Sequence, residues 1–541
     1  MKSSRRTSYA SLLVICTLAL LFRYPRSGNE FGVDSFLWHG MVTSLNSHHS
    51  ALWVLNPLSY FGLYPLSQPS GSVFLLSEIT QVANMPIEAA ILLLDFIVGI
   101  LGVLGCFLLG REFSLRPRFA LLLALVLSLT PEFIDSLTWQ VPTRILFTAL
   151  IPYLLWGMIR FTRTPSIRGV FLVGIVLALM MSFHRLAILM VLVAVASVIT
   201  LIVLVSVRAL RIQFPTLFLR PVIFRNTSWF ALIGIFLVSI AMIVQGNVLQ
   251  EYSSGVIVSG DSHVIQMLNL FVSLSRSAGL LLPLAFVGVV VLIRRRAKTF
   301  AEPFLVVTLL AFLPTLFLRQ YTGFYTIPLT SLFIVAGVDA VLSRIRSNAV
   351  RLGVATLIVM IALGSGEAIV RYDLSQDSAL TSREYSLGLY SMHTIDGTWV
   401  FSDGLEGARS SAISGVRYLP IGGATTAFQG PELLTFGFVN RNQLVIRPLR
   451  PGDLTIESDS PFYLEGVQAE ADWAGLHASR VDSIPSRIVT AYEPKYLVTD
   501  SAHPFSYYAY GKYYQSQLAL SAFELRYAVY SDGAVTVWDL G

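Results

Sequence analysis

The sequence predicts a polytopic α-helical membrane protein, with about 11 transmembrane helices followed by a small mixed α/β domain outside the cytoplasm. Composition is the first reason, because 54% of the 541 residues are hydrophobic and only 13% are charged, which is too apolar for a soluble chain of this length. The second is that long apolar runs fill the chain only as far as about Glu367. We therefore predict a transmembrane domain over residues 1–368 and an extracytoplasmic α/β domain over residues 369–541.

Each predicted transmembrane helix is an apolar run that approaches the roughly 20 residues needed to cross a bilayer. The first run, 9–22, follows Lys2, Arg5 and Arg6 and has no small-residue cleavage site after it. It therefore predicts an uncleaved helix instead of a removed signal peptide. The other predicted helices cover 87–109, 119–133, 145–161, 167–183, 186–207, 229–244, 278–293, 300–317, 324–342 and 352–368.

Basic residues between the runs predict the orientation. Alternate connections, beginning with the amino terminus, contain 20 lysines or arginines, and the opposite connections contain 6. By the positive-inside rule, the amino terminus is cytoplasmic, and an odd number of helices exports the C-terminal domain. The loop after the first helix then lies outside too. Because topology accounts for the net charge of +6, the basic balance does not indicate a nucleic-acid partner.

The C-terminal part has the turn residues and short alternating segments of a soluble α/β domain. Strands are predicted at 398–402, 415–421, 443–449, 454–457 and 496–499, and a hairpin over 527–537 turns at Asp532-Gly533. Residues 506–523 predict a helix that carries five tyrosines. These rings can stack on sugars or pack in a core.

The loop after the first helix contains the first candidate site. A long connection between two membrane helices is uncommon unless it has a function. Glu30, Asp34 and His39 occur here with two glycines within residues 29–40. Asp34 stands among apolar residues, where a carboxylate can act as a general base or a metal ligand. The alternative is that Asp34 caps a helix that begins at Ser35.

A second outer connection, residues 130–144, offers two further acids, Glu132 and Asp135, and the cation Arg144. Since both connections emerge on the same side, the second can meet the Asp34 loop. The alternative is that these acids simply face water.

Cations at the outer ends of other helices suit a lipid-linked phosphate. His184-Arg185 interrupts apolar sequence, and Arg319 follows another apolar run. The alternative for each arginine is a helix-end anchor that reaches the membrane surface. Asp95 lies inside the second predicted helix, where an ionisable side chain is costly and is therefore functional or partnered.

This layout resembles the C-type glycosyltransferase (GT-C) superfamily of polytopic enzymes, which have an acid in a long first outer loop, a second acid in a later outer loop and an exported C-terminal domain. Oligosaccharyltransferase catalytic subunits, protein O-mannosyltransferases and lipid A aminoarabinose transferases share this plan. The residues that look alike are Gly32-Val33-Asp34-Ser35 with His39, the Glu132/Asp135 loop, and Arg319 with Tyr325 and Pro328.

The resemblance implies roles for these residues. Asp34, with Glu132 or Asp135, would be catalytic. The residues expected to bind substrate are His39, Arg144, His184, Arg185, Arg319 and Tyr325. The first loop has one acid at the expected point instead of an adjacent pair, so the resemblance establishes no cofactor and leaves open a magnesium or manganese ion on Asp34 and Glu132. The Trp-Trp-Asp signature of oligosaccharyltransferases is missing, so recognition of a glycosylation sequon is not expected.

The predicted function is transfer of a sugar from a polyprenyl-phosphate-linked donor to a glycan, lipid or protein acceptor on the outer face of the membrane. Two other classes stay open. One is a transporter or flippase that uses Asp95, Asp34 and Arg185 as a substrate or proton path. The other is a noncatalytic protein that assembles surface polysaccharide.

Overall fold

The structure is a computed structural model, and it describes residues 2–25, 27–49, 71–114, 116–209, 271, 274–275, 277–295, 299–318, 324–374, 380–395, 399–402, 404–420, 493–500, 506–509, 512–515 and 527–540. Arg319, the predicted helix 229–244 and the predicted strands 443–449 and 454–457 lie outside these residues.

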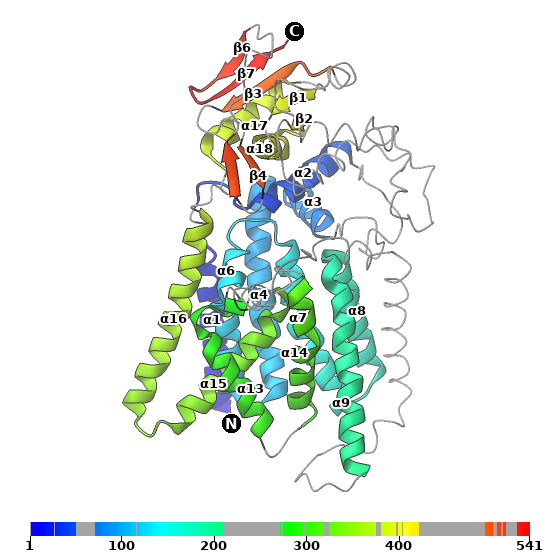
Figure 1. The fold of residues 1–541 in the computed structure, drawn as a ribbon, viewed down its shortest axis with the longest axis vertical. Helices are drawn as coiled ribbons and strands as arrows, with labels where there is room; N and C mark the ends of the chain where they lie inside the picture. Colours follow the sequence, from blue (N-terminus) through cyan, green and yellow to red (C-terminus); the bar gives the residue numbers. More distant parts are fainter. Residues whose placement is uncertain are drawn as a thin grey trace.

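A bundle of apolar helices forms the larger part of the molecule (Figure 1). Its helices are α1 (Lys2–Leu21), α4 (Ile87–Phe113), α5 (Pro117–Ser128), α7 (Thr143–Arg163), α8 (Ile167–Phe183), α9 (Val191–Ala209), α13 (Leu282–Arg294), α14 (Ala301–Leu318), α15 (Ile327–Arg344) and α16 (Asn348–Leu374). They match ten of the predicted segments. Two short 3₁₀ helices, η2 (Arg185–Met190) and η4 (Gly279–Leu281), precede α9 and α13.

Four stretches of the described chain are long and apolar enough to cross a bilayer, and six further apolar helices are shorter. The four stretches are Ile87–Phe113, Thr143–Arg163, Phe324–Arg344 and Asn348–Ala368. The chain is therefore a membrane protein with several apolar helices. The total of about 11 spans stays a prediction.

Small residues on α4 let its neighbours approach closely. A Cβ atom added at Gly105 would lie 2.5 Å from the ring of Tyr153 on α7. One added at Gly110 would lie 2.6 Å from the Cα atom of Ala120 on α5. Only glycine fits such contacts, which is a common basis of helix packing in membranes.

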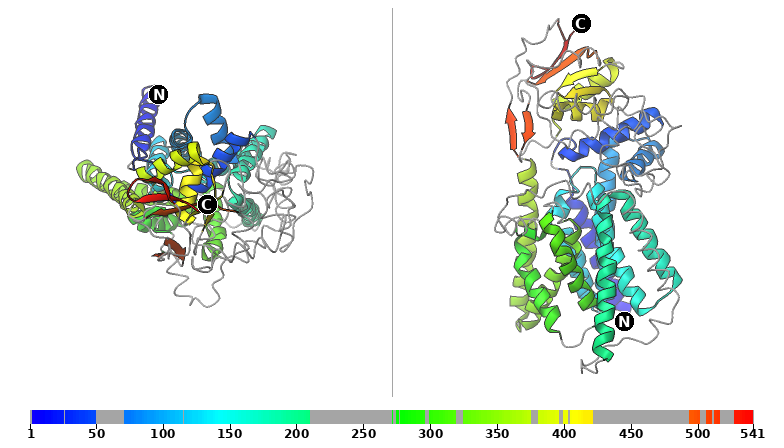
Figure 2. Two further views of the ribbon diagram at one scale, coloured as in Figure 1. Left: turned by 90° about the horizontal axis from the view of Figure 1, so that it is seen from above. Right: turned by 45° about the vertical axis from the view of Figure 1, so that its right-hand side comes forward.

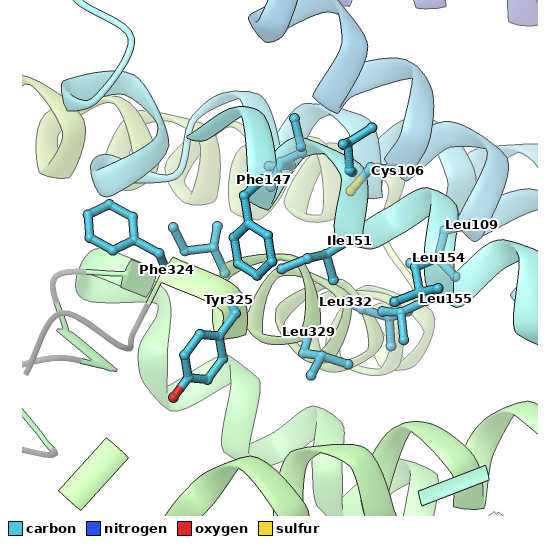
Figure 3. Close-up of a cluster of buried hydrophobic side chains, with 14 of the residues drawn as sticks. Cys106, Leu109, Phe147, Ile151, Leu154, Leu155, Phe324, Tyr325, Leu329 and Leu332 are labelled. Carbon is cyan, nitrogen blue, oxygen red and sulfur yellow. The ribbon is translucent and has the colours of Figure 1, made fainter. Parts of the chain in front are cut away.

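The core of the bundle lies where α4, α7 and α15 meet. Figure 3 shows Cys106 of α4, Ile151 of α7 and Leu329 of α15 in one cluster, with Phe147 and Tyr325 toward one side of it. These side chains are all buried. The cluster fixes α7 against α15, and so fixes the first turns of both helices.

The two termini lie at opposite ends of the molecule (Figure 1). We call the end of the bundle beside the C-terminal strands the outer end, and the end with the amino terminus the inner end. The connections rich in arginine, such as 111–118 and 344–351, lie at the inner end, as the chain direction of α4, α5, α15 and α16 requires. The sequence predicts that the inner end is cytoplasmic.

The C-terminal unit is a mixed sheet with two helices. Its elements are α17 (Ser382–Thr394), β1 (Trp399–Ser402), α18 (Gly404–Ser414), β2 (Arg417–Pro420), β3 (Tyr496–Asp500), β6 (Ala528–Ser531) and β7 (Val535–Asp539). The strand order is β2-β1-β3-β7-β6. β2, β1 and β3 are parallel, and β7 pairs antiparallel with both β3 and β6.

One prediction for this unit is wrong. Residues 506–523 were expected to form a helix, but β4 (Ser506–Ala509) and β5 (Lys512–Gln515) pair as an antiparallel hairpin. Tyr507 is paired with Tyr514 and Tyr508 with Tyr513. Aromatic residues favour strands. The spacing of the tyrosines therefore did not predict the secondary structure of this segment correctly.

Helices α2 (Val33–His48) and α3 (Gly71–Ala83) lie between the bundle and the C-terminal unit (Figures 1 and 2). α2 packs against α18. Phe36 of α2 is buried in the same apolar cluster as Leu387 of α17 and Val400 of β1. The first outer loop thus supplies part of the core of the C-terminal unit.

Candidate functional site

The candidate site begins at the amino end of α2. Gly32 precedes the helix with a φ angle of +94°, a conformation that favours glycine. Because Gly32 is the N-cap residue, Asp34 falls within the first turn of the helix. The structure therefore does not support the alternative that Asp34 caps a helix beginning at Ser35. A carboxylate in a first helical turn is favoured by the helix dipole.

Glu30, just before α2, holds the helix by two side-chain contacts. It is fully buried. Ser35 Oγ donates a hydrogen bond to Glu30 Oε1 at 2.5 Å, and His39 Nδ1 lies 2.5 Å from Glu30 Oε2. Ser35 and His39 are four residues apart, so both lie on the same face of α2. Both carboxylate oxygens of Glu30 are occupied in this way, which makes it a positioning residue for α2.

The pKa of His39 is raised above its ordinary value. Burial by itself would lower the pKa, but the negative charge of Glu30 and the hydrogen bond to it act in the opposite direction and prevail, with a further contribution from Glu88. His39 therefore holds its proton to a higher pH than a free histidine. A buried charge that is paired and hydrogen-bonded in this way avoids most of the cost of burial.

Backbone and side-chain hydrogen bonds join the first outer loop to the second. Phe31 N donates to Trp139 O at 2.9 Å. Val141 N donates to Ser35 Oγ at 2.7 Å. The side chain of Gln140 covers Gly32, where an added Cβ atom would lie 2.6 Å from Gln140 Oε1. The two loops that carry the predicted acids are thus packed directly on each other.

The second-loop acids lie on α6 (Pro131–Asp135), a single short helix that begins with a proline. Asp135 is 8% exposed, and its carbonyl oxygen accepts a hydrogen bond from Gln140 Nε2 at 2.5 Å. Glu132 is half-buried. The structure therefore places both acids in the connection that contacts Gly32 and Ser35.

Asp95 has partners that the sequence did not reveal. Its Oδ2 atom accepts a hydrogen bond from Gln140 N at 3.1 Å, and the opposite charge of Arg23 acts on it. Arg23 is fully buried, and its guanidinium group donates to Ala19 O at 2.7 Å and lies 4.9 Å above the Phe133 ring. Asp95, on α4, thus holds the second outer loop through Gln140, close to the buried cation Arg23.

Arg144 stands in the first turn of α7, at the end of the second loop. Its guanidinium carbon lies 5.7 Å from the centre of the Phe324 ring. Both residues line a cavity of about 60 Å³ together with Ser35, Trp38 and Gln140. A cavity of this size has room for a few water molecules. The cavity therefore has Ser35 of α2 and the cation Arg144 of α7 in the same wall lining.

The remaining predicted residues fall around the same end of α7. His184 ends α8, and its ring centre lies 5.8 Å from that of Phe147, one turn after Arg144. Arg185 begins η2 directly after it. Tyr325 is buried (Figure 3). Its ring centre lies 4.9 Å from that of Phe312. A substrate contact for Tyr325 stays a prediction, as does the role of Arg319, which lies outside the described residues.

A metal site depends on how many acidic side chains gather. In the described part of the chain, no group of three or more histidine, cysteine, aspartate or glutamate side chains is placed to hold a metal ion. Glu30 is engaged by His39 and Ser35. Of the two residues named for a divalent ion, Glu132 lies on α6, and the structure describes only the backbone of Asp34. The residues described do not make a metal site by themselves, so a bound cation stays a prediction.

Sequence reasoning assigned no role to Glu30, Ser35 or Arg23. Glu30 was noted only as an acid upstream of Asp34. The signal that could have identified it is the position of an acid, a serine and a histidine at 30, 35 and 39, where the last two share one helical face. No sequence pattern links Arg23 to Asp95, because the electrostatic effect of Arg23 on Asp95 depends on how α1 packs on α4.

Comparisons with known proteins concern the fold of the chain. A family model for dolichyl-phosphate-mannose-protein mannosyltransferases matches residues 67–229, less than a third of the chain. Oligosaccharyltransferase AglB from Archaeoglobus fulgidus, in complex with an inhibitory peptide and a dolichol-phosphate, is similar at a TM-score of 0.57 and 13% identity, covering 92% of this chain and 70% of that one. ArnT from Cupriavidus metallidurans, bound to undecaprenyl phosphate, is similar at a TM-score of 0.54 and 11% identity, covering 100% and 98%.

The chain has the GT-C fold. Arabinofuranosyltransferase AftD from Mycobacteria is a further GT-C protein of similar fold, at a TM-score of 0.50 and 13% identity, and covers 98% of this chain and 41% of its own. AglB has also been crystallised in complex with zinc and sulfate. No curated protein sequence matches the chain. The resemblance expected from the outer loops is thus confirmed at the level of the fold.

Proposed function

We propose that this GT-C protein transfers a sugar from a polyprenyl-phosphate-linked or polyprenyl-diphosphate-linked donor to an acceptor at the outer end of the bundle. The observation that carries the proposal is the direct packing of the two acid-bearing loops, with Ser35 hydrogen-bonded both to Glu30 and to Val141 N. In solved GT-C structures, AglB binds a dolichol-phosphate and ArnT binds undecaprenyl phosphate. Such lipids fit a site at the end of a bundle of apolar helices.

The reaction requires little from the protein beyond position and charge. The bond between the sugar C1 atom and the donor phosphate oxygen breaks, and a bond from C1 to the acceptor oxygen forms on the opposite face, which inverts the configuration. In our proposal Asp34 takes the acceptor proton. The phosphate leaves with the negative charge, which nearby cations offset. Glu30 and Ser35 position the turn that carries Asp34, so they act without touching the substrate.

Three cations are proposed for the phosphate. Arg144 lines the cavity next to Ser35, and it stands in the first turn of α7, where backbone N–H groups also favour an anion. Arg319 belongs to the connection that leads to Phe324, which lies against Arg144. Arg185 follows His184, beside α7. A guanidinium group suits this task because its planar fork pairs two phosphate oxygens. Whether transfer requires a divalent cation on Asp34 and Glu132 is to be measured with and without a chelator.

The test is a donor assay with the purified protein in lipid nanodiscs. A mixture of polyprenyl-linked sugars is extracted from membranes, labelled in the sugar and supplied with the protein. We expect the label to leave the lipid and free polyprenyl phosphate or diphosphate to appear. The same donors in sealed liposomes distinguish the main alternative. If the protein moved the lipid-linked sugar between leaflets without breaking its bond to phosphate, the transferase proposal would fail and a flippase would be indicated.

A further inference from the structure

A second cavity in the described part of the chain is far from the outer loops. It measures about 770 Å³ and lies at the inner end of the bundle, between α13, α15 and the turn from α4 to α5. The proposed transferase function does not use it. Its walls combine apolar side chains, such as Phe119 and Val291, with four arginines near helix ends, Arg116, Arg294, Arg295 and Arg344.

The cavity is next to a close crossing of two helices. α13 and α15 run side by side, and a Cβ atom added at Gly288 would lie 1.8 Å from Phe333 O. One added at Gly337 would lie 2.1 Å from Leu284 O. The two backbones therefore touch at these glycines. Most cavity residues of α13 and α15 follow the glycines in sequence, so the crossing closes the cavity toward the outer end.

The charge of the cavity is strongly positive. Asp339 is the single acid among its lining residues, and it lies 3.7 Å from Arg116. Arg295 pairs with Glu302 outside the cavity, at 2.8 Å. Within the residues that the structure describes, no ion pair is found for Arg294 or Arg344. Arg294 and Arg344, at the ends of two parallel helices, therefore line one cavity and have no acidic partner among the described residues.

The mouth of the cavity is apolar. Phe286 is 56% exposed and Val290 is 48% exposed, and both line the cavity on α13. Exposed apolar side chains on a membrane helix face lipid chains, whereas arginines at a helix end lie at the depth of the headgroups. One anionic lipid can contact both the arginines and the apolar mouth, because its phosphate lies at headgroup depth and its chains extend into the bilayer.

We propose that the cavity binds an anionic phospholipid of the inner-end leaflet, with its phosphate between Arg294 and Arg344 and a chain against Phe286 and Val290. Basic pockets between transmembrane helices are known to bind anionic headgroups. Arginines that merely anchor helix ends would bind any lipid headgroup at the open surface and would need no cavity. A bound lipid would fill the space between α13 and α15 and stabilise their packing.

The experiment is native mass spectrometry of the purified full chain, titrated with phosphatidylglycerol or with phosphatidylcholine of the same chains. We expect phosphatidylglycerol to bind at a lower lipid concentration than phosphatidylcholine. It should also stay bound at higher collision energies. The double variant Arg294→Gln/Arg344→Gln should weaken this binding roughly 25-fold, since each arginine near an anionic headgroup contributes about fivefold. The matched control is Arg118→Gln/Arg346→Gln, which removes the same charge from exposed positions that do not line the cavity.

A second variant tests the cavity itself. Ala340→Trp keeps all four arginines but places an indole among the lining residues, and it should also displace phosphatidylglycerol. The proposal is overturned if phosphatidylcholine binds as well as phosphatidylglycerol, or if both double variants behave alike. It is also overturned if Ala340→Trp binds like the wild type, because the arginines would then act at the open surface. Preferential retention of a polyprenyl phosphate over phosphatidylglycerol would likewise reject a bilayer phospholipid as the occupant.

Discussion

Two buried glutamates on either side of α2 are held in different ways. Glu30, on the side of the bundle, contacts Ser35 and His39. Glu384, in the C-terminal unit, forms an ion pair with Arg409 and accepts a hydrogen bond from Thr381 N at 2.6 Å. The Arg409 guanidinium carbon lies 5.7 Å from the centre of the Phe36 ring. α2 thus lies between a carboxylate paired with a titratable side chain and one paired with a permanent cation.

The Glu384–Arg409 contact is independent of pH in the physiological range, whereas the Glu30–His39 contact depends on it. An arginine keeps its charge throughout the physiological pH range, so the Glu384–Arg409 pair keeps its strength there. A histidine gains or loses its proton near neutral pH, so the strength of the Glu30 contact depends on pH. The Glu384–Arg409 pair joins α17 to α18 and reaches α2 through the Phe36 ring, whereas Glu30 sets the position of the turn that carries Asp34.

The largest loss of stability is expected for Arg409→Ala. It would leave the carboxylate of Glu384 buried without its cation, which typically costs about 3–5 kcal/mol. The measurement is the free energy of unfolding of the C-terminal unit by denaturant in detergent. Arg383→Ala is the control, since Arg383 is the exposed arginine next to Glu384, and exposed substitutions usually change stability by no more than about 0.5 kcal/mol. Equal effects of the two substitutions would show that the buried pair contributes nothing special.

A smaller loss is expected for Glu30→Gln. Glutamine keeps the shape of the side chain but removes the charge that His39 and Ser35 contact, and hydrogen bonds to a charged group contribute about 1.5–3 kcal/mol. The midpoint of thermal unfolding should fall, and transfer should slow because the turn at Asp34 is held less well. Glu78→Gln on α3 removes an exposed carboxylate and is the matched control. If Glu30→Gln melts like this control, Glu30 does not position α2.

The smallest effect is a dependence on pH through His39. Because the pKa of His39 is raised in the folded protein, its stabilising contribution is complete below the ordinary histidine pKa of about 6.5 and is lost as pH rises through the raised value. The melting temperature of the wild type should therefore decline across this window. His39→Gln should remove that decline while leaving the Glu384–Arg409 contribution unchanged. A decline of the same size in His39→Gln would assign it to another group.

Much of the fold was predictable because each membrane helix corresponds to an apolar run in the sequence. The segment 167–183 coincides with α8, and the hairpin turn at Asp532-Gly533 separates β6 from β7. α3 was not predicted, because it lies in a loop and lacks the length of a span. The tyrosine-rich segment was assigned to a helix, since side-chain spacing alone does not separate a short hairpin from a helix.

The candidate site was predictable only in part. Charge alternation placed the Asp34 loop and the second acid loop on one side, and the structure packs them together through Phe31, Ser35 and Val141. The partner of Asp95 could not be predicted, since Arg23 approaches it only after α1 packs on α4. Likewise, the contact of Phe36 with the C-terminal unit joins segments far apart in sequence.

The central claim is that Asp34 performs chemistry while Glu30 only positions it, and the most direct measurement compares turnover with stability in Asp34→Asn. The account predicts that transfer from a polyprenyl-linked donor falls by about 10²–10⁴-fold, the usual contribution of a general base, while the unfolding midpoint stays near that of the wild type. Removing one negative charge from the first turn of α2 costs only about 0.3–1 kcal/mol through the helix dipole, so a weakened helix start cannot produce this result. An Asp34→Asn protein that transfers sugar at the wild-type rate would contradict the account.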